Sequence, residues 1–274
     1  MSESHPYQDP VAQILKVDTP TNWQDVWIDY PTQYGLTKAD VPELIRLAKD
    51  EELTDSESPS IYSGIHALRA AAQLDPETTF NEYLALLAKF PDDDYLHEEI
   101  RGMCIQVGEI AIAPLKQNLN NNQIDVWLRV SAANGLEEVS KAYPELRETC
   151  IQILREELQN YRDRKKDILD STLITNLTEL KAIEVVDLIA EVFSNRELDE
   201  FITGSWASVQ VELGLKQESD FSSKQLAPKM PDYMLAWQKD QRQREFQKPL
   251  NEIVLPPRPV AKGFGSSKNK KKKK

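Results

Sequence analysis

One short segment contains most of the residues whose types and spacing chemistry would need. Six acidic or histidine side chains stand between positions 92 and 99: Asp92, Asp93, Asp94, His97, Glu98 and Glu99. On a helix, Asp94 and His97 share a face, as a metal site or an acid–base pair requires. A structural interpretation also fits, because acidic residues in the first turn stabilise a helix by about 0.3–1 kcal/mol. We favour the structural interpretation and expect no bound metal.

Three further polar residues stand on otherwise apolar predicted helices. We expect His66 and Arg69, on a helix over 60–74, to be partly buried beside a concave surface, with ligand contact as the alternative. Arg129 is expected to form hydrogen bonds between helices, with anion binding as the alternative. Folding could also bring His66 near His97. The candidate binding residues are therefore His66, Arg69, His97, Glu98 and Arg129.

Motifs for catalysis are missing from the sequence. It contains no glycine-rich phosphate loop, no GxSxG elbow, no HExxH and no Cys–His nucleophile spacing. Cys104 and Cys150 lack metal-ligand spacing and stand among apolar residues, which predicts two small core side chains. We therefore expect neither an enzyme nor a protein that needs a cofactor.

The elements that must position these residues are helices in a repeating pattern. Predicted helices end at Leu74, Val107, Val139 and Leu180, at intervals of 33, 32 and 41 residues. A second amphipathic helix follows each one, over 80–87, 110–119, 143–158 and 183–193. Such helix pairs bury their apolar faces only by stacking on similar neighbours. The pattern predicts an all-α, right-handed α-solenoid of about four to five helix pairs over 23–215, in which the small residues Ala132, Ala133 and Gly135 allow close helix approach.

The flanking segments have different compositions. We expect a flexible segment over 1–22, and an aromatic cap on the open end of the helical stack from Trp23, Trp27, Tyr30 and Tyr34. The region around Trp206 is expected to cap the other end. Residues 216–261 are predicted to be a linker with a possible amphipathic docking helix over 230–250, whose contact residues would be Met234, Trp237 and Phe246.

Charge is distributed unevenly along the chain. The formal net charge is −12, yet seven lysines fall in the last thirteen residues, namely Lys262, Lys268, Lys270, Lys271, Lys272, Lys273 and Lys274. Without them the chain has 26 basic and 45 acidic residues, a formal charge of −19. An acidic body excludes a DNA-binding domain that presents a basic face. The predicted disordered tail 262–274 would contact RNA, ribosomes or an anionic membrane, or else stay solvated or bind the acidic body.

Targeting signals are also missing. The sequence has no apolar run of eighteen residues, and its first residues lack the basic and apolar regions of a signal peptide. A cytoplasmic protein without a membrane span is the expectation, and we expect a monomer.

Short motifs recur in a defined order along the helices. They are His66-Ala67-Leu68-Arg69, Leu74, Asp94-Tyr95, Glu98-Glu99, Gly108, Ala113-Pro114-Leu115, Ala132-Ala133-Asn134-Gly135-Leu136, Leu173-Ile174, Leu180-Lys181-Ala182, Glu184 and Gly204-Ser205-Trp206 through Leu215. Over residues 23–216 the chain resembles HEAT-like α-solenoids with phycobilin-lyase-type repeats, and more closely a bacterial HEAT-like family of unknown function. The resemblance implies no catalytic residues. Some relatives carry a cysteine-rich SEC-C-type zinc motif, which does not carry over, because no cysteine follows Cys150.

Repeats without catalytic motifs favour binding over chemistry. We expect a non-catalytic scaffold or adaptor, such as an assembly or maturation factor, that binds a protein partner on the solenoid surface. One alternative is a ribosome- or RNA-associated factor that acts through the lysine tail. The other is a lyase-like or cofactor-handling protein of the same repeat class.

Overall fold

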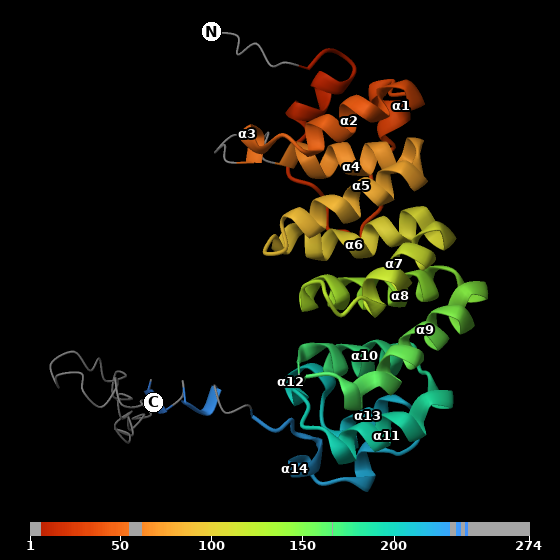
Figure 1. Cartoon of the computed structure of the whole chain (residues 1–274), viewed down its shortest axis with the longest axis vertical. Helices are drawn as coiled ribbons and strands as arrows, with labels where there is room; N and C mark the ends of the chain where they lie inside the picture. The colour runs from red at the N-terminus through yellow and green to blue at the C-terminus, as the bar shows by residue number, and fades with distance from the viewer. Residues whose placement is uncertain (1–6, 55–61, 166, 231–233, 237–238, 241–274) are drawn as a thin grey trace, which may run out of the picture. The chain divides into compact units, whose positions relative to one another are not determined.

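The computed structural model describes residues 7–54, 62–165, 167–230, 234–236 and 239–240, and all its regular elements there are helices (Figure 1). The prediction of an all-helical protein is confirmed, since no strand occurs in these ranges. The chain divides into two units, residues 1–229 and 230–274. Within the first unit no described helix is both long and apolar enough to cross a membrane, and the same holds for the described residues of the second.

Four pairs of helices make up most of the first unit. The first helices of the pairs are α4 (Ser63–Leu74), α6 (Asp94–Val107), α8 (Val126–Ala142) and α10 (Ile168–Glu179). The second helices are α5 (Pro76–Lys89), α7 (Ile112–Asn120), α9 (Arg147–Gln159) and α11 (Val186–Asn195). Short 3-10 helices precede three of these: η4 (Gly108–Ala111), η5 (Pro144–Leu146) and η7 (Ile183–Val185).

Smaller helices flank the four pairs. Before them come η1 (Val11–Lys16), α1 (Tyr30–Tyr34), η2 (Lys38–Asp40), α2 (Val41–Ala48) and α3 (Glu51–Thr54). Between α9 and α10 lies η6 (Asn160–Asp163), and after the pairs come α12 (Glu200–Thr203), α13 (Trp206–Glu212), η8 (Glu218–Asp220) and α14 (Ser223–Leu226).

Aspartate residues fix the starts of three first helices. The side chains of Asp93, Asp125 and Asp167 accept hydrogen bonds from backbone N–H groups of the first turn, at 3.0, 2.8 and 2.9 Å. Each satisfies a donor that the helix leaves unpaired and places a negative charge at the positive end of the helix dipole. The repeated cap explains why α6, α8 and α10 begin at corresponding places in their pairs.

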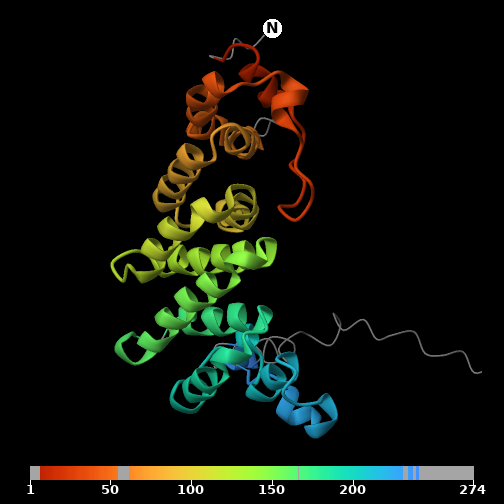
Figure 2. The same cartoon turned by 90° about the vertical axis from the view of Figure 1, so that its right-hand side faces the viewer.

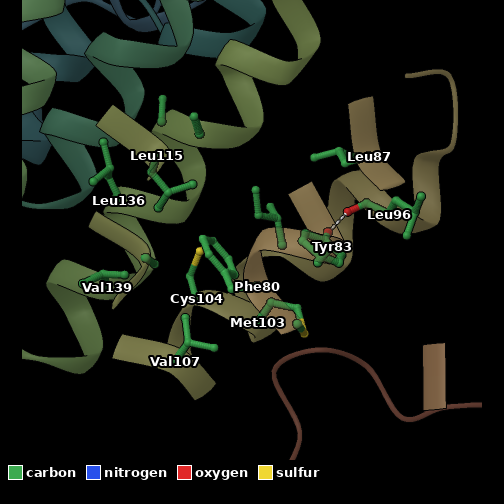
Figure 3. Close-up of a cluster of buried hydrophobic side chains, with 14 of the residues drawn as sticks. Phe80, Tyr83, Leu87, Leu96, Met103, Cys104, Val107, Leu115, Leu136 and Val139 are labelled. Carbon is green, nitrogen blue, oxygen red and sulfur yellow. Dashed lines mark hydrogen bonds between the residues drawn. The ribbon is translucent and has the colours of Figure 1, made fainter. Parts of the chain in front are cut away.

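Each first helix packs on the next, and α5, α7 and α9 pack against them. α4 contacts α2, α5 and α6, and α8 contacts α6, α7, α9 and α10. Figure 3 shows the core that joins the second and third pairs, including Cys104 of α6, Leu115 of α7 and Leu136 of α8. A Cβ on Gly135 would lie 2.8 Å from the Cys104 sulfur, so glycine permits the close approach of α6 and α8. Burial raises the pKa of both cysteine thiols, that of Cys150 to about 11, so neither is a reactive thiolate at neutral pH.

The N-terminal segment from residue 7 is folded, where the sequence predicted flexibility over 1–22. Its apolar side chains Tyr7, Val11, Ile14, Leu15 and Val17 are all buried. The Tyr7 hydroxyl donates to Asp50 Oδ2 at 2.6 Å, and the Arg46 guanidinium lies 4.0 Å from the centre of the Tyr7 ring. Contacts with the helices therefore offset the entropy cost of ordering this short segment, which its own residues could not offset alone.

The first unit also continues past residue 215, where the sequence placed the end of the repeats. Ser205 Oγ donates to the Leu226 carbonyl at 3.3 Å, and the backbone N–H of Lys229 donates to Glu200 at 2.6 Å. Residues 216–229 are therefore held against the helices before them instead of forming a free linker. In the second unit, the described stretches 234–236 and 239–240 are helical, and Leu235 is exposed.

Candidate functional site

The acidic segment 92–99 divides into residues with different surroundings. Asp93 caps α6, and Glu99 is buried against Arg69. Asp92, Asp94 and Glu98 are exposed. Across the described ranges, no group of three or more His, Cys, Asp or Glu side chains has a geometry that could hold a metal ion. The segment therefore combines helix capping, one buried ion pair and an exposed acidic edge.

Both ring nitrogens of His97 are occupied by internal partners. Nε2 lies 2.7 Å from the Pro91 carbonyl and Nδ1 lies 2.6 Å from Ser131 Oγ. A carbonyl oxygen only accepts, so Nε2 donates to it, and in the neutral ring Nδ1 accepts from the serine hydroxyl. His97 thus links the loop before α6 to α8 and has no ring nitrogen left for a metal.

His66 is buried and makes the same kind of contacts with the N-terminal segment. Its Nε2 donates to the Asp18 carbonyl at 2.6 Å, and its Nδ1 accepts from the Tyr30 hydroxyl at 2.5 Å. Burial lowers the pKa of His66, and the neighbouring Arg69 charge lowers it further, which favours the neutral ring. His66 and His97 therefore serve separate hydrogen-bond sets and share none of these partners.

The two candidate arginines are internal links. Arg69 forms a bidentate pair with Glu99, at 2.6 and 2.7 Å, and the side chains are 2% and 7% exposed. Arg129 donates to the Leu119 carbonyl at 2.8 Å and to Glu157 at 2.6 Å, which joins α7, α8 and α9. Each arginine pairs with a buried glutamate and donates to a backbone carbonyl, so the structure gives each a role in joining elements.

An extended loop covers one side of α4 and α6. This covering loop (residues 17–28) leads from η1 to α6 and turns back toward α1, as Figure 2 shows. Side chains of α4 hold its backbone: besides His66 on Asp18, Arg69 donates to the Thr21 carbonyl at 3.0 Å and Gln73 donates to the Ile28 carbonyl at 2.8 Å. Bonds to carbonyl groups do not depend on the side chains of the loop.

Two tryptophans of the covering loop lie on α6, where the sequence had predicted an aromatic cap at the end of the stack. A Cβ on Gly102 would come within 2.7 Å of the Trp27 ring and 3.2 Å of Trp23 Cβ, so only glycine leaves room there. Arginine guanidinium groups lie over both rings, Arg69 at 4.8 Å from Trp27 and Arg101 at 5.6 Å from Trp23. Cation–π contacts of this kind are worth about 0.5–2 kcal/mol each.

An open groove adjoins the middle of the covering loop. It has a volume of about 710 Å³ and lies between Trp23 of the loop and Trp127 of α8. His97, Arg101 and Asn134 line it, and Asp92, Asp94 and Glu98 line its acidic side. The Trp127 side chain is 47% exposed. Among the candidate residues, the structure therefore brings His97 and Glu98 to one surface and leaves His66, Arg69 and Arg129 in internal contacts.

Aromatic side chains recur at the starts of the first helices. Tyr62, Tyr95 and Trp127 stand 33 and 32 residues apart, the same intervals that separate the helix ends. Tyr95 is 61% exposed, and its ring lies edge-on to Tyr62 with centroids 6.4 Å apart. We call Tyr62, Tyr95 and Trp127 the aromatic series. The spacing was present in the sequence, but it becomes a signal only with the structure, in which Tyr95 and Trp127 are exposed and Tyr62 is half-buried.

The remaining predicted contacts fall in the second unit. Met234 is described and half-buried. Trp237, Phe246 and the lysines from Lys262 to Lys274 lie outside the described residues. Their predicted roles in docking and in polyanion contact stay predictions.

The fold and groove define a class: an all-helical protein of successive helix pairs with an open, partly aromatic surface beside its first helices. Residues 38–233 match the family described as "Protein of unknown function (DUF1186)", and because this match spans more than half of the sequence, the chain belongs to that family. The description names neither HEAT repeats nor phycobilin lyases. No curated protein matches the chain, and no solved structure matches it.

Proposed function

We propose that this chain is a non-catalytic, cytoplasmic adaptor or scaffold that binds a segment of a protein partner on the surface of a HEAT-like, right-handed solenoid. The order of the helices supports the solenoid. Each first helix packs on the next one, and a second helix follows it at intervals typical of two-helix repeats. Such an array gives a partner an extended surface without requiring chemistry.

The observation that carries the proposal is the aromatic series at equivalent places of three successive pairs, in which Tyr95 and Trp127 are exposed and Tyr62 is half-buried. Aromatic side chains normally contribute to cores, and they are enriched where proteins bind one another. Trp127 borders a groove, and Tyr95 borders the hollow on the other side of Trp23. A partner segment lying along the first helices would therefore meet one aromatic side chain from each pair.

The test is site-specific photo-crosslinking with the full chain in native lysate. A photoreactive residue replaces Tyr95 in one version and the exposed Gln152 on α9 in a matched control. We expect a discrete protein to be crosslinked from position 95, to be retained at high salt, and to be lost when Trp127→Ala is added. Equal crosslinking from both positions would contradict the proposal. So would retention of ribosomal components alone, at low salt alone, because the lysine tail would then be the functional element.

A further inference from the structure

The groove between Trp23 and Trp127 has a definite charge, and this charge restricts what can bind there. Asp92, Asp94 and Glu98 are exposed at its edge, and the structure shows no ion pair for them within the described ranges. The positive group in the groove, Arg101, is already engaged, with Glu138 at 2.9 Å and Glu137 at 3.8 Å. The unpaired charge that faces a ligand is therefore negative.

The aromatic edge of the groove favours the same kind of ligand. On the covered side, arginine guanidinium groups lie over Trp23 and Trp27. Trp127 is the next indole along the first helices, and no cation lies over it among the described residues. An exposed indole beside three carboxylates attracts a lysine or arginine side chain both through the ring face and through the charges.

The groove also offers a donor for an extended backbone. Asn134 lies 33 plus 32 residues after Arg69, at the corresponding place of its helix, and Arg69 holds a carbonyl of the covering loop. The Oδ1 of Asn134 accepts from Asn176 at 3.1 Å. Its amide N–H groups have no acceptor in the described part of the chain, so they are available to a ligand carbonyl.

We propose that the groove binds an extended, lysine- or arginine-bearing segment of the partner protein. One cationic side chain lies over Trp127 and pairs with Asp94 and Glu98, and a backbone carbonyl accepts from Asn134. The inference rests on the proposed adaptor function and specifies the chemistry of its partner. Nucleic acid is disfavoured as the occupant, because its phosphates would face three carboxylates.

Binding of defined peptides to the full chain tests this proposal. The probes are fluorescein-labelled ten-residue peptides that alternate glycine with lysine, arginine or glutamate, and the readout is anisotropy at two salt concentrations. We expect the lysine and arginine peptides to bind, and the glutamate peptide not to bind. Comparable binding of the glutamate peptide would overturn the proposal.

The acidic body could attract cationic peptides without a specific site. A charge-matched control therefore distinguishes general attraction from binding in the groove. Asp92→Asn/Asp94→Asn/Glu98→Gln removes three charges from the groove, and Glu145→Gln/Glu148→Gln/Asp187→Asn removes three exposed charges elsewhere. We expect the groove variant to weaken binding about tenfold or more and the control to weaken it less than twofold. Equal weakening by both would mean general attraction and would overturn the site.

An aromatic control completes the design. Trp127→Ala removes the indole, and Phe201→Ala removes a side chain that is similarly exposed, 46% against 47%. We expect the affinity for the cationic peptides to fall about fivefold or more for Trp127→Ala and to stay unchanged for Phe201→Ala. The circular dichroism of both variants should be unchanged. If the groove variant no longer binds the peptide but still crosslinks to the protein partner, the proposal of a cationic partner segment is wrong, and the proposed adaptor function is retained. If neither Trp127→Ala nor the groove variant affects peptide or partner, both proposals fail.

Discussion

The same side of the first helices is covered at α4 and open at α8. At α4, side chains at successive turns hold the carbonyl groups of the covering loop, through His66, Arg69 and Gln73. At α8, Trp127 and Asn134 line a groove that no segment of the described chain fills. One region therefore shows an extended chain bound to this surface, and the other presents related groups without an occupant.

The comparison separates two uses of polar residues. The residues under the covering loop have partners inside the chain and fix its structure, as the Arg69–Glu99 pair does. In the groove, Asn134 keeps free amide donors, Trp127 keeps an open ring face, and the three carboxylates keep charges that no described residue pairs. Stability effects should therefore be large in the covered region and small in the open one, and effects on binding should show the reverse order.

The largest effect is expected from Arg69→Met in the covered region. It leaves the buried Glu99 carboxylate without its partner, and breaking a buried ion pair from one side costs about 3–5 kcal/mol. Urea unfolding measures the change. Lys116→Met is the control, since the Lys116–Glu156 pair is 45% and 44% exposed and should contribute no more than about 1 kcal/mol.

The double variant Arg69→Met/Glu99→Met sharpens this prediction. It removes both buried charges, so it should recover most of the lost unfolding free energy, as apolar replacements of buried pairs often do. It should not restore the hydrogen bond to the Thr21 carbonyl. Hydrogen exchange of residues 17–28 should therefore stay faster than in the wild type, and normal protection of this segment would contradict the assigned role of Arg69.

The next largest change in unfolding free energy is expected from a glycine substitution on α6 under the covering loop. A glycine on α4 that does not face the tryptophans is the control. Gly102→Ala places a methyl group 2.7 Å from the Trp27 ring, so the covering loop must move. We expect the free energy of unfolding to fall by about 1–2 kcal/mol, even though alanine has a better helix propensity than glycine. A Cβ on Gly64 would meet Ala48 at 3.5 Å, an ordinary contact, so Gly64→Ala should be neutral or stabilising by a few tenths to about 1 kcal/mol. Stabilisation by both would show that the loop does not pack on α6.

These contrasts also explain what the sequence could and could not predict. The helix pairs follow from local periodicity and from acidic caps, which lie within a few residues of the elements they define, and the predicted second helices agree with α5, α7, α9 and α11. The covering loop was missed because its partners lie far away in sequence. Asp18 and His66 are 48 residues apart. Helix side chains hold carbonyl groups of its backbone, and such contacts leave no pattern in the sequence of the loop.

The groove shows the same limit. His97 and Glu98 were recognised as candidates by their types, and the structure does place both at the groove. Asn134 was named only within a helical motif and Trp127 was not singled out, because an aromatic or amide residue at a helical position is equally compatible with a core. Exposure decides between these possibilities, and exposure depends on which neighbours pack against the helix.

A pH-dependent effect is expected from His66, again in the covered region. Its pKa is lowered in the folded state, so below its ordinary value of 6.5 the unfolded chain binds a proton that the folded ring resists. The stabilising contribution is therefore present above about pH 6.5 and is lost as pH falls. The difference in unfolding free energy between the wild type and His66→Gln should shrink from pH 7.5 to pH 5.5, and a difference that is equal at both values would contradict the neutral, buried ring.

The smallest stability effect is expected from Trp127→Ala, and it tests the comparison most directly. About half of this side chain faces solvent, so its removal should change the unfolding free energy by no more than about 0.5–1 kcal/mol. Trp27→Ala is the matched variant, because that ring packs on Gly102 and under Arg69 and should cost about 1–3 kcal/mol. Urea unfolding of both variants measures the two losses of unfolding free energy. An equal loss for both would mean that Trp127 stabilises the fold as Trp27 does. The surface at α8 would then lack the surplus of unsatisfied groups that distinguishes a binding groove from a covered one.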